Sequence, residues 1–193
     1  MRHQLSQAFR FTLLMTILTG LIYPGVVTGL CQFLFPRPAN GSLVEVNGKI
    51  VGSILLGQNF SKPEYFHPRP SAAGNDGYDA TASGGSNLGP TNQKLIDRVK
   101  GDIAKFRKEN PDYQGPIPAD MVTTSASGLD PDISLASALA QAPRVARARG
   151  ATLDQVKQLI ETHAKGRRWG FLGEPRINVL YVNLALNQEL PAK

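Results

Sequence analysis

A glycine-rich run is the first group of residues in this sequence that could do chemistry. The stretch "ASGGSNLGPTN", residues 82–92, packs Ser, Gly and Asn densely and then runs into a helical pattern. Backbone amides that no side chain shields, close to a helix N-terminus, can bind an anion such as a phosphate. The run lacks the GxxxxGK[ST] spacing of a P-loop. Because most glycine-rich loops are turns, the residues alone favour a structural loop over a nucleotide site.

Metal chemistry lacks the residues that it would need. The three histidines, His3, His67 and His163, lie far apart, and Cys31 is the only cysteine. No zinc-binding spacing results from them. We therefore predict no metal site, and we expect His163 to pack on the apolar face of a helix.

A hydrolytic site is the second kind of chemistry to weigh. The stretch "TSASGLDPD" holds Ser125, Ser127 and Asp130, and triad members meet in space rather than in sequence. It lacks the G-x-S-x-G spacing, and a turn leading into a helix capped by Asp130 explains it better. We predict no catalytic residue in this chain and keep a hydrolase as the alternative.

Arginines offer a third kind of chemistry, the clamping of anions or of backbone. Arg69, Arg144, Arg147 and Arg149 could each hold a carboxylate, a phosphate or a partner's backbone. For Arg147 and Arg149 we favour a solvated helix surface. The net charge is +6 over 193 residues, but the basic residues are scattered, so we expect no nucleic-acid partner.

An apolar segment at residues 11–35 must position everything that follows it. It reads "FTLLMTILTGLIYPGVVTGLCQFLF" without a charged residue. As a helix it would rise about 37 Å, against a hydrocarbon core of roughly 30 Å. A cleaved signal would have a shorter apolar region and a small-residue cleavage site, and a lipoprotein signal would not have Leu30 before the cysteine. We predict an uncleaved transmembrane helix.

The flanking charges predict how this helix is oriented. Arg2, Arg10 and the amino terminus precede it without an acidic residue, whereas Glu45 offsets Arg37 and Lys49 beyond it. The positive-inside tendency places residues 1–10 in the cytoplasm and residues 36–193 outside it.

Small residues in the span predict close packing with other membrane helices. Gly25 and Gly29 form a GxxxG motif, and Gly20 continues a second stripe that begins at Thr12 and Thr16. We also expect Pro24 to kink the helix between the two stripes.

The part that follows the span is predicted to be an α+β domain with a small β-sheet and about four helices. Two β-rich runs flank Asn47-Gly48, which is typical of a type I′ hairpin. Residues 58–92 are expected to form an ordered irregular segment that packs on other elements. Helices are predicted over residues 91–110 and from Asp130 to a break or kink at Pro143. A short helix after Pro143 is expected to stop at Gly150, and a further helix is expected to begin at a Thr152/Gln155 capping box. "INVLYVNLALNQEL" is expected to be a strand that turns into a short helix.

Long stretches of the chain resemble one family. "YFHPRPSA", "SGGSNLGPTN", "SGLDPDIS" and "INVLYVNLAL" are similar to the C subunit of the Kdp potassium-transporting ATPase, and the likeness covers almost the whole chain. The resemblance implies a single-pass subunit of the bacterial inner membrane. Its implied partners are a channel-like subunit that binds potassium, a P-type subunit that hydrolyses ATP, and a small membrane subunit.

The resemblance also implies a role and a set of contacts. The family's C subunit is described as a catalytic chaperone that raises the ATP affinity of the hydrolysing subunit, without a stably bound cofactor of its own. Carried over, the nucleotide contacts would be Ser83, Gly84, Gly85, Ser86 and Asn87, with Gln141. An external loop cannot touch cytoplasmic ATP, so we favour the topology and expect any effect on ATP affinity to be a coupling between distant sites.

Docking to the partners is expected from the irregular segment. We predict that residues 58–92 lie on the external face of the channel-like subunit, with Tyr65, Phe66, His67 and Arg69 as anchors. Two other readings stay open, a membrane-tethered external enzyme and an anchored nucleotide-binding regulator with its domain in the cytoplasm.

Overall fold

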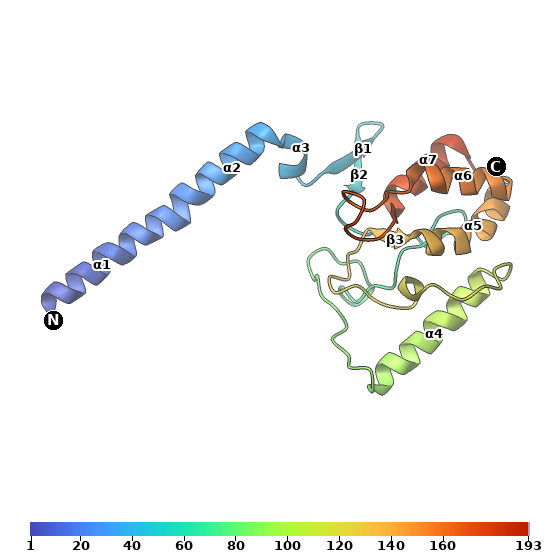
Figure 1. Cartoon of the computed structure of the whole chain (residues 1–193), viewed down its shortest axis with the longest axis horizontal. Coiled ribbons are helices and arrows are strands. Elements are labelled where there is room, and N and C mark those ends of the chain that lie inside the picture. Colours follow the sequence, from blue (N-terminus) through green and yellow to red (C-terminus); the bar gives the residue numbers. More distant parts are fainter. Residues whose placement is uncertain (193) are drawn as a thin grey trace. The chain divides into compact units, whose positions relative to one another are not determined.

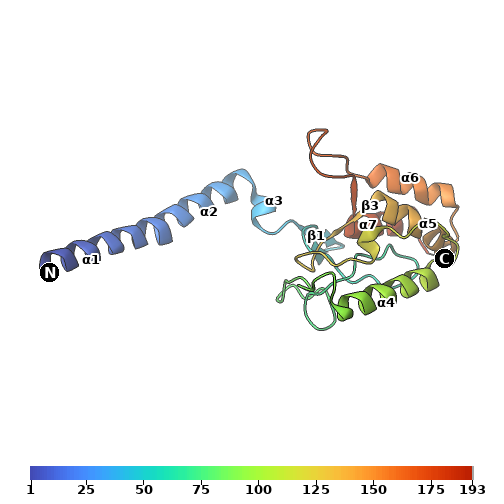
Figure 2. The same cartoon turned by 60° about the horizontal axis from the view of Figure 1, so that its bottom comes forward.

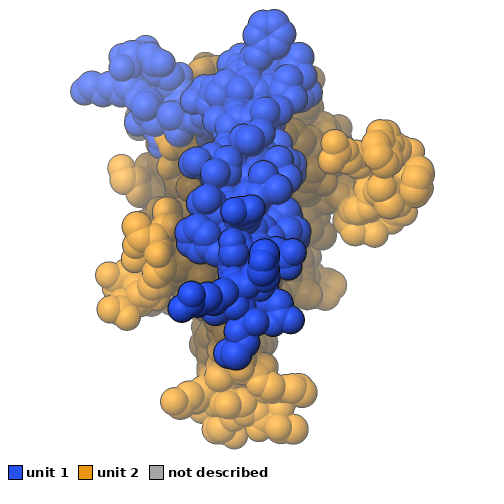
Figure 3. Space-filling model, turned by 90° about the vertical axis from the view of Figure 1, so that its left-hand side faces the viewer, with its two compact units in different colours: residues 1–51 blue, residues 52–193 orange. Residues whose placement is uncertain are grey.

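The computed structural model describes residues 1–192 and divides the chain into two compact units (Figure 3). Unit 1 is Met1–Val51, and unit 2 begins at Gly52. The boundary predicted at residue 36 is where the chain would leave the membrane, which differs from the division into compact units. It stays a prediction.

A long apolar helix makes up most of unit 1. It consists of α1 (Arg2–Ile17), a π-helical turn η1 (Leu18–Ile22) and α2 (Tyr23–Leu34). The stretch Arg2–Leu34 is 33 residues long, with a mean hydropathy of 1.8 in its most apolar part, so it is long and apolar enough to cross a membrane. The helix therefore begins nine residues earlier than the predicted span, because residues 2–10 contain no helix breaker.

The predicted irregularity at Pro24 takes the form of the π-helical turn. Pro24 has no N–H to give to the carbonyl four residues back, and its ring crowds that carbonyl. The N–H of Tyr23 instead donates to Leu18 O, five residues earlier. The helix is therefore wider in the turn that precedes the proline.

Short elements follow the apolar helix. They are α3 (Pro36–Ala39), β1 (Leu43–Val46) and β2 (Lys49–Ser53), and the two strands pair with one another. Asn47 and Gly48 between them both have positive φ, 52° and 74°. Those angles are the type I′ geometry, so the hairpin prediction is confirmed.

Residues 58–92 contain no helix or strand, as predicted, and yet they pack against the rest of unit 2. Phe66 and Ala73 in this segment are fully buried. The segment leads to α4 (Gln93–Glu109), whose first turn is capped by the side chain of Asn92.

The predicted inner face of α4 is only partly covered. Phe106 is buried near its C-terminal end, but Ile96 and Ile103 remain 37% and 41% exposed. In Figures 1 and 2, α4 lies on one side of the irregular segments of unit 2, and α5, α6 and α7 lie on the other.

The prediction of a helix capped by Asp130 is wrong. Residues 132–134 instead form β3 (Asp132–Ser134), which pairs antiparallel with β4 (Arg176–Asn178), Ile133 opposite Ile177. A short 3₁₀ turn η2 (Ala119–Met121) precedes β3. The described residues thus form two separate two-stranded sheets rather than one small sheet.

Helix α5 (Leu135–Arg149) begins after β3, capped by the Ser134 side chain. It continues through Pro143, so of the predicted break or kink there the break is wrong, and the two predicted helices are one. Gly150 ends it in the left-handed conformation, as predicted. Helix α6 (Leu153–His163) opens on the predicted Thr152/Gln155 capping box, and α7 (Val179–Glu189) follows β4 directly.

The core of unit 2 lies where α5, α6, α7 and the β3–β4 pair meet. Alanines on α5 allow the neighbouring helices to approach, and branched side chains from the other elements fill the space. The largest fully buried apolar side chains are Phe66, Ile133, Ile160, Ile177, Leu186, Val145, Val156 and Val182. Phe66 is the member that the irregular segment contributes. The α+β prediction is confirmed, and the described part of unit 2 contains four α-helices.

Candidate functional site

Five consecutive backbone carbonyls of the irregular segment accept hydrogen bonds from side chains of α5 and α7. They belong to the stretch "PEYFH", residues 63–67, and their donors are Arg144, Arg149, Gln141 and Asn183. Irregular backbone cannot satisfy its own polar groups, so a buried stretch of this kind requires partners from elsewhere. We call residues 58–70 the clamped segment.

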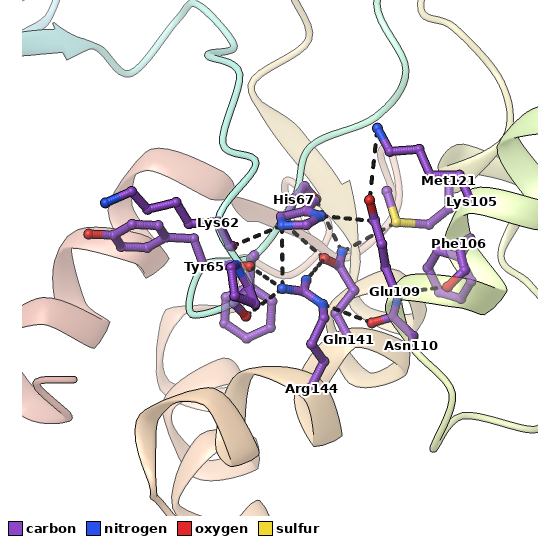
Figure 4. A network of polar contacts seen from close by, with 12 residues as sticks. Lys62, Tyr65, His67, Lys105, Phe106, Glu109, Asn110, Met121, Gln141 and Arg144 are labelled. Atoms are coloured by element: carbon purple, nitrogen blue, oxygen red, sulfur yellow. Dashed lines mark hydrogen bonds and ion pairs between the residues drawn. The ribbon is translucent and has the colours of Figure 1, made fainter. Parts of the chain in front are cut away.

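Arg144 makes the largest share of these contacts from inside the protein. Its Nη1 donates to Pro63 O at 2.6 Å and Tyr65 O at 2.9 Å, and its Nη2 donates to Gln141 Oε1 at 2.6 Å. Its Nε donates to Asn110 Oδ1, which ties α4 to the same cluster (Figure 4). Burial lowers the pKa of the Arg144 guanidinium to about 10, and the charges of Glu109 and Glu64 oppose that shift.

His67 and Glu109 form the outer part of the cluster. His67 Nδ1 lies 3.2 Å from Glu109 Oε2, and Nε2 lies 2.9 Å from Lys62 O and 3.3 Å from Arg144 Nη1 (Figure 4). Burial alone would raise the pKa of Glu109, but the His67 hydrogen bond and charge, with Lys105 and Arg144, hold it below its usual value. Both ring nitrogens of His67 are thus engaged, and this histidine holds α4 to the clamped segment.

A cleft of about 280 Å³ opens beside this cluster. Residues of the clamped segment and of the following turn line one side, Asp102, Lys105 and Phe106 of α4 line another, and Met121 and Gln141 also reach it. The charges are of both signs. Burial raises the pKa of the Asp102 carboxyl, against the charges of Arg98 and Lys105.

Arg69 and Tyr78 also line the cleft. Arg69 Nη1 lies 2.5 Å from Asp130 Oδ2, and the Tyr78 hydroxyl donates to Arg69 O. Burial raises the pKa of the Tyr78 phenol, and the negative charge of Asp130 adds to that effect. The arrangement holds the end of the clamped segment against the loop before β3.

The residues expected to contact a nucleotide are not brought together. Gln141 is buried, and its amide bonds His67 at both backbone atoms, at 2.8 and 3.1 Å. Residues 83–87 instead lie against residues 124–128, where Gly84 N donates to Ser127 O at 2.8 Å. None of residues 83–87 lines the cleft that Gln141 reaches. Helix α4 begins only at Gln93, so residues 83–87 do not lie at its N-terminus.

The four predicted docking anchors fall into two environments. Phe66 is fully buried, with its N–H and C=O both bonded to the Asn183 amide, so it contacts the core rather than the surface. Tyr65, His67 and Arg69 are each partly exposed. The Tyr65 ring lies 5.6 Å from that of Phe60 and 5.1 Å from the Arg149 guanidinium.

Arg149 is a structural residue that the sequence reading missed. It is 3% exposed rather than solvated, and it donates to Glu64 O, Leu186 O and Leu190 O. A cation at the C-terminal end of α7 also meets the negative end of the helix dipole. Its position directly before Gly150, at the end of a helix, was the available signal. Arg147 is exposed as expected and pairs with Asp112.

Asn183 is the second residue that the sequence reading missed. It lies on α7 with 1% exposure, where it bonds both backbone atoms of Phe66. A lone asparagine on the buried face of an otherwise apolar helix needs a polar partner, and that requirement was the signal.

Within residues 1–192, Ser125, Ser127 and His163 bond to atoms of their own turn or helix. Ser125 Oγ lies 3.3 Å from Ser127 Oγ and accepts from Gly128 N, and Ser127 Oγ accepts from Leu129 N. His163 is partly buried and its Nδ1 lies 3.0 Å from Leu159 O. The same range contains no group of three His, Cys, Asp or Glu side chains that could hold a metal ion.

The glycines of the apolar helix face open space within unit 1. A Cβ built on Gly20, Gly25 or Gly29 would meet nothing within 4 Å. Another helix could therefore approach the backbone closely at these positions.

Comparison with known proteins gives one consistent result. The family model described as KdpC, "K+-transporting ATPase, c chain", matches residues 5–188. Proteins named potassium-transporting ATPase KdpC subunit are similar over nearly their full length. One from Myxococcus xanthus is 56% identical over 94% of this chain and 86% of its own. One from Koribacter versatilis is 53% identical over 99% of this chain and 97% of its own. One from Mycobacterium tuberculosis is 52% identical over 97% of this chain and 100% of its own.

A family model matches nearly all of this chain, and these relatives share more than half of its residues. The chain therefore belongs to the KdpC family, the c chain of the K+-transporting ATPase.

Proposed function

We propose that this chain is the membrane-anchored accessory subunit of an ATP-driven potassium pump. The family match over residues 5–188 carries the proposal, because it includes both the apolar helix and unit 2. The partners would be a channel-like potassium-binding subunit, a P-type ATP-hydrolysing subunit and a small membrane subunit. Potassium would then concern this chain only through those partners.

Anchoring would be provided by Arg2–Leu34. Its length and hydropathy support a single crossing of the bacterial inner membrane, and the flanking charges support a cytoplasmic N-terminus. Unit 2 would then be periplasmic. The open glycine faces at Gly20, Gly25 and Gly29 support packing against helices of the other subunits.

ATP hydrolysis would take place on the P-type subunit, with this chain as a catalytic chaperone that raises the ATP affinity of its partner. The Gln141 amide supports an indirect effect, because both its ends are already bonded to His67. The effect on ATP would then be a coupling between distant sites, worth a few-fold to about a hundredfold in affinity. No stably bound cofactor is needed for that role.

Docking to the channel-like subunit is proposed for the exposed edge of the clamped segment. Tyr65, His67 and Arg69 have the aromatic and basic side chains that contribute most to binding at protein interfaces. Phe66 would not contact the partner, because its side chain is buried in the core of unit 2. Replacing Tyr65 and Arg69 with alanine should reduce recovery of the complex from detergent. A double variant at the exposed residues Lys157 and Glu161 on α6 is the control, and equal recovery of both variants would contradict this docking surface.

Kinetics of the assembled pump test the proposed role. Potassium-stimulated ATPase activity is measured in membranes that contain the other subunits, with and without this chain. We expect that its absence raises KM for ATP by a few-fold or more while the hydrolysing subunit stays phosphorylatable. An unchanged KM would refute the chaperone role. ATPase activity of this chain alone would support the enzyme alternative instead.

Labelling tests the topology independently of activity. Asn87 is exposed on the glycine-rich run, so a single cysteine at Asn87 in a Cys31→Ser chain should react with an impermeant maleimide in intact spheroplasts. Reaction only after lysis would place unit 2 in the cytoplasm and would favour the anchored nucleotide-binding regulator.

A further inference from the structure

An exposed hairpin follows α6 and ends at the first residue of β4, and its tip has no role in the fold or in the sites described so far. We call residues 165–176 the tryptophan hairpin, after Trp169, the only tryptophan of the chain. Its base is closed by paired backbone hydrogen bonds between Lys165 and Arg176, and its tip by a second pair between Arg168 and Leu172. In Figure 2 it projects from unit 2 as a dark red loop.

The tip of the tryptophan hairpin presents large apolar side chains to solvent. Trp169 is 76% exposed, Phe171 69% and Leu172 44%. Trp169 and Gly170 both have positive φ, 53° and 82°. That conformation is uncommon for a bulky residue, and the two ladder pairs hold it. Three neighbouring apolar side chains on one fixed turn form a patch, rather than the scattered exposure that is normal for a soluble surface.

Basic side chains surround this apolar tip. The tryptophan hairpin carries four cations, Lys165, Arg167, Arg168 and Arg176, against the single carboxylate of Glu174. Glu174 pairs with Arg167 at 2.8 Å, and Arg176 pairs with Asp132 at 2.8 Å. The Arg168 guanidinium lies 5.6 Å from the centre of the Trp169 ring. The segment as a whole therefore stays positive.

We propose that the tryptophan hairpin inserts its tip into the surface of the lipid bilayer and binds anionic headgroups with its arginines. Tryptophan and phenylalanine are favoured at the level of the headgroups, where their rings are half in hydrocarbon. Lys and Arg next to such a tip gain from the negative surface potential of anionic lipids. The combination matches an interfacial anchor that lies on a membrane rather than spanning it.

The proposed span is the reason that lipid is favoured over another occupant. The proposal rests on the membrane anchoring proposed above, because that anchoring keeps unit 2 near a bilayer. Only 17 residues separate the end of α2 at Leu34 from the start of unit 2 at Gly52. Even fully extended they reach roughly 60 Å. Unit 2 is thus tethered within roughly 60 Å of a lipid surface, and the excess of cations in the tryptophan hairpin favours a surface that carries anionic headgroups.

The single tryptophan makes the test direct. The full chain is reconstituted alone into vesicles of phosphatidylcholine, with or without phosphatidylglycerol, and Trp169 fluorescence is excited where tyrosine does not absorb. With phosphatidylglycerol we expect a blue-shifted emission, loss of most of that emission when the acyl chains are brominated, and protection from a water-soluble quencher. Flotation with the vesicles reports the span separately, so its failure is distinguishable from failure of the hairpin.

Variants locate the effect. Replacing Arg167 and Arg168 with glutamine should lower the ratio of inserted to free hairpin about fivefold for each cation removed. The matched control removes two exposed lysines of α4, Lys100→Gln and Lys108→Gln, and should leave quenching by brominated lipid unchanged. Quenching is expressed as the ratio of emission in brominated and ordinary lipid, which cancels any change that Arg168 causes in the Trp169 quantum yield.

Two results would overturn the proposal. The first is a chain that floats with the vesicles while Trp169 stays open to the water-soluble quencher and insensitive to brominated lipid. The second is protection of Trp169 that arises only when the other pump subunits are present, which would assign the tryptophan hairpin to a protein partner.

Discussion

Two irregular segments of unit 2, the clamped segment (residues 58–70) and the glycine-rich run (residues 82–92), are held in different ways. In the clamped segment, five consecutive carbonyls accept from side chains of α5 and α7, and Phe66 is fully buried. In the glycine-rich run, Gly84 N and Ser83 Oγ both donate to one carbonyl, Ser127 O, and Ser83 and Asn87 are exposed.

The difference shows where the stability of an irregular segment comes from. Backbone without a helix or a sheet has to find partners for its polar groups, and a buried stretch has no water to supply them. The clamped segment therefore depends on long side chains from distant helices, whereas the glycine-rich run can rely on solvent. Changes to the clamped segment or its partners should be far more damaging than changes to the run.

The largest effect is expected from Phe66→Ala. Its ring fills the core of unit 2, and its loss removes buried apolar surface and leaves a cavity, worth about 3–5 kcal/mol. The measurement is urea unfolding of the full chain in detergent, followed by circular dichroism. Tyr65→Ala is the matched control, because that ring is only partly buried, and equal destabilisation by the two variants would contradict the contrast drawn here.

Asn183→Ala should cause the second-largest loss of stability. It leaves the N–H and the C=O of Phe66 without their partner inside the protein, about 2–4 kcal/mol for the two groups together. Asn187→Ala, one turn later on α7 at an exposed position, loses only its contact with Arg149 and should destabilise less. A loss below that of Asn187→Ala would mean that water replaces the Asn183 amide.

Gly128→Ala tests a point where the glycine-rich run, through Gly84, lies close to the buried residue Ala73. Gly128 has φ of +68°, and an added Cβ would lie 2.7 Å from Ala73 N and 2.8 Å from Gly84 O. Both the conformation and the space exclude a side chain, so we expect a loss of about 1–3 kcal/mol, measured by the same unfolding experiment. Gly166→Ala is the control, since its Cβ would meet nothing within 4 Å.

Acid should weaken the clamped segment through Glu109. The folded protein holds the pKa of Glu109 below its ordinary value of 4.5. Burial by itself would raise that pKa, but the hydrogen bond and the charge of His67 lower it by more, together with the nearby cations. The unfolded chain therefore binds the proton more readily. The contribution is present above the ordinary pKa and is lost as pH falls through the lowered one. Since the side chain is about a third exposed, we expect less than about 1 kcal/mol.

Glu109→Gln should remove that part of the pH dependence. Unfolding is measured from neutral pH down to acid for the wild type and the variant. Glu161→Gln, at an exposed position on α6, is the control and should follow the wild type. Parallel pH profiles for wild type and Glu109→Gln would exclude the His67–Glu109 contact as a source of stability.

The contrast between the two segments also explains what could be predicted from the sequence. Local signals were sufficient for the Asn47-Gly48 hairpin, the Thr152/Gln155 capping box and the stop at Gly150, because each depends on neighbours in the chain. They failed at Asp130 and Pro143, where pairing of β3 with β4 and the packing of α5 override local preference. The clamped segment could be predicted to pack, but not which side chains hold it, since Arg144 and Asn183 are 79 and 117 residues from the groups they bind.

The smallest effect is expected from Gly84→Ala, and it bears most directly on function. Gly84 has no positive φ, and the nearest atom to an added Cβ is Ala82 O at 4.0 Å, so stability should change by no more than about 0.5 kcal/mol. The variant keeps the N–H that donates to Ser127 O. If the run is periplasmic, KM for ATP of the assembled pump should be unchanged. A raised KM with unchanged stability would instead indicate that this run contacts the nucleotide, and unit 2 would then have to lie on the cytoplasmic side.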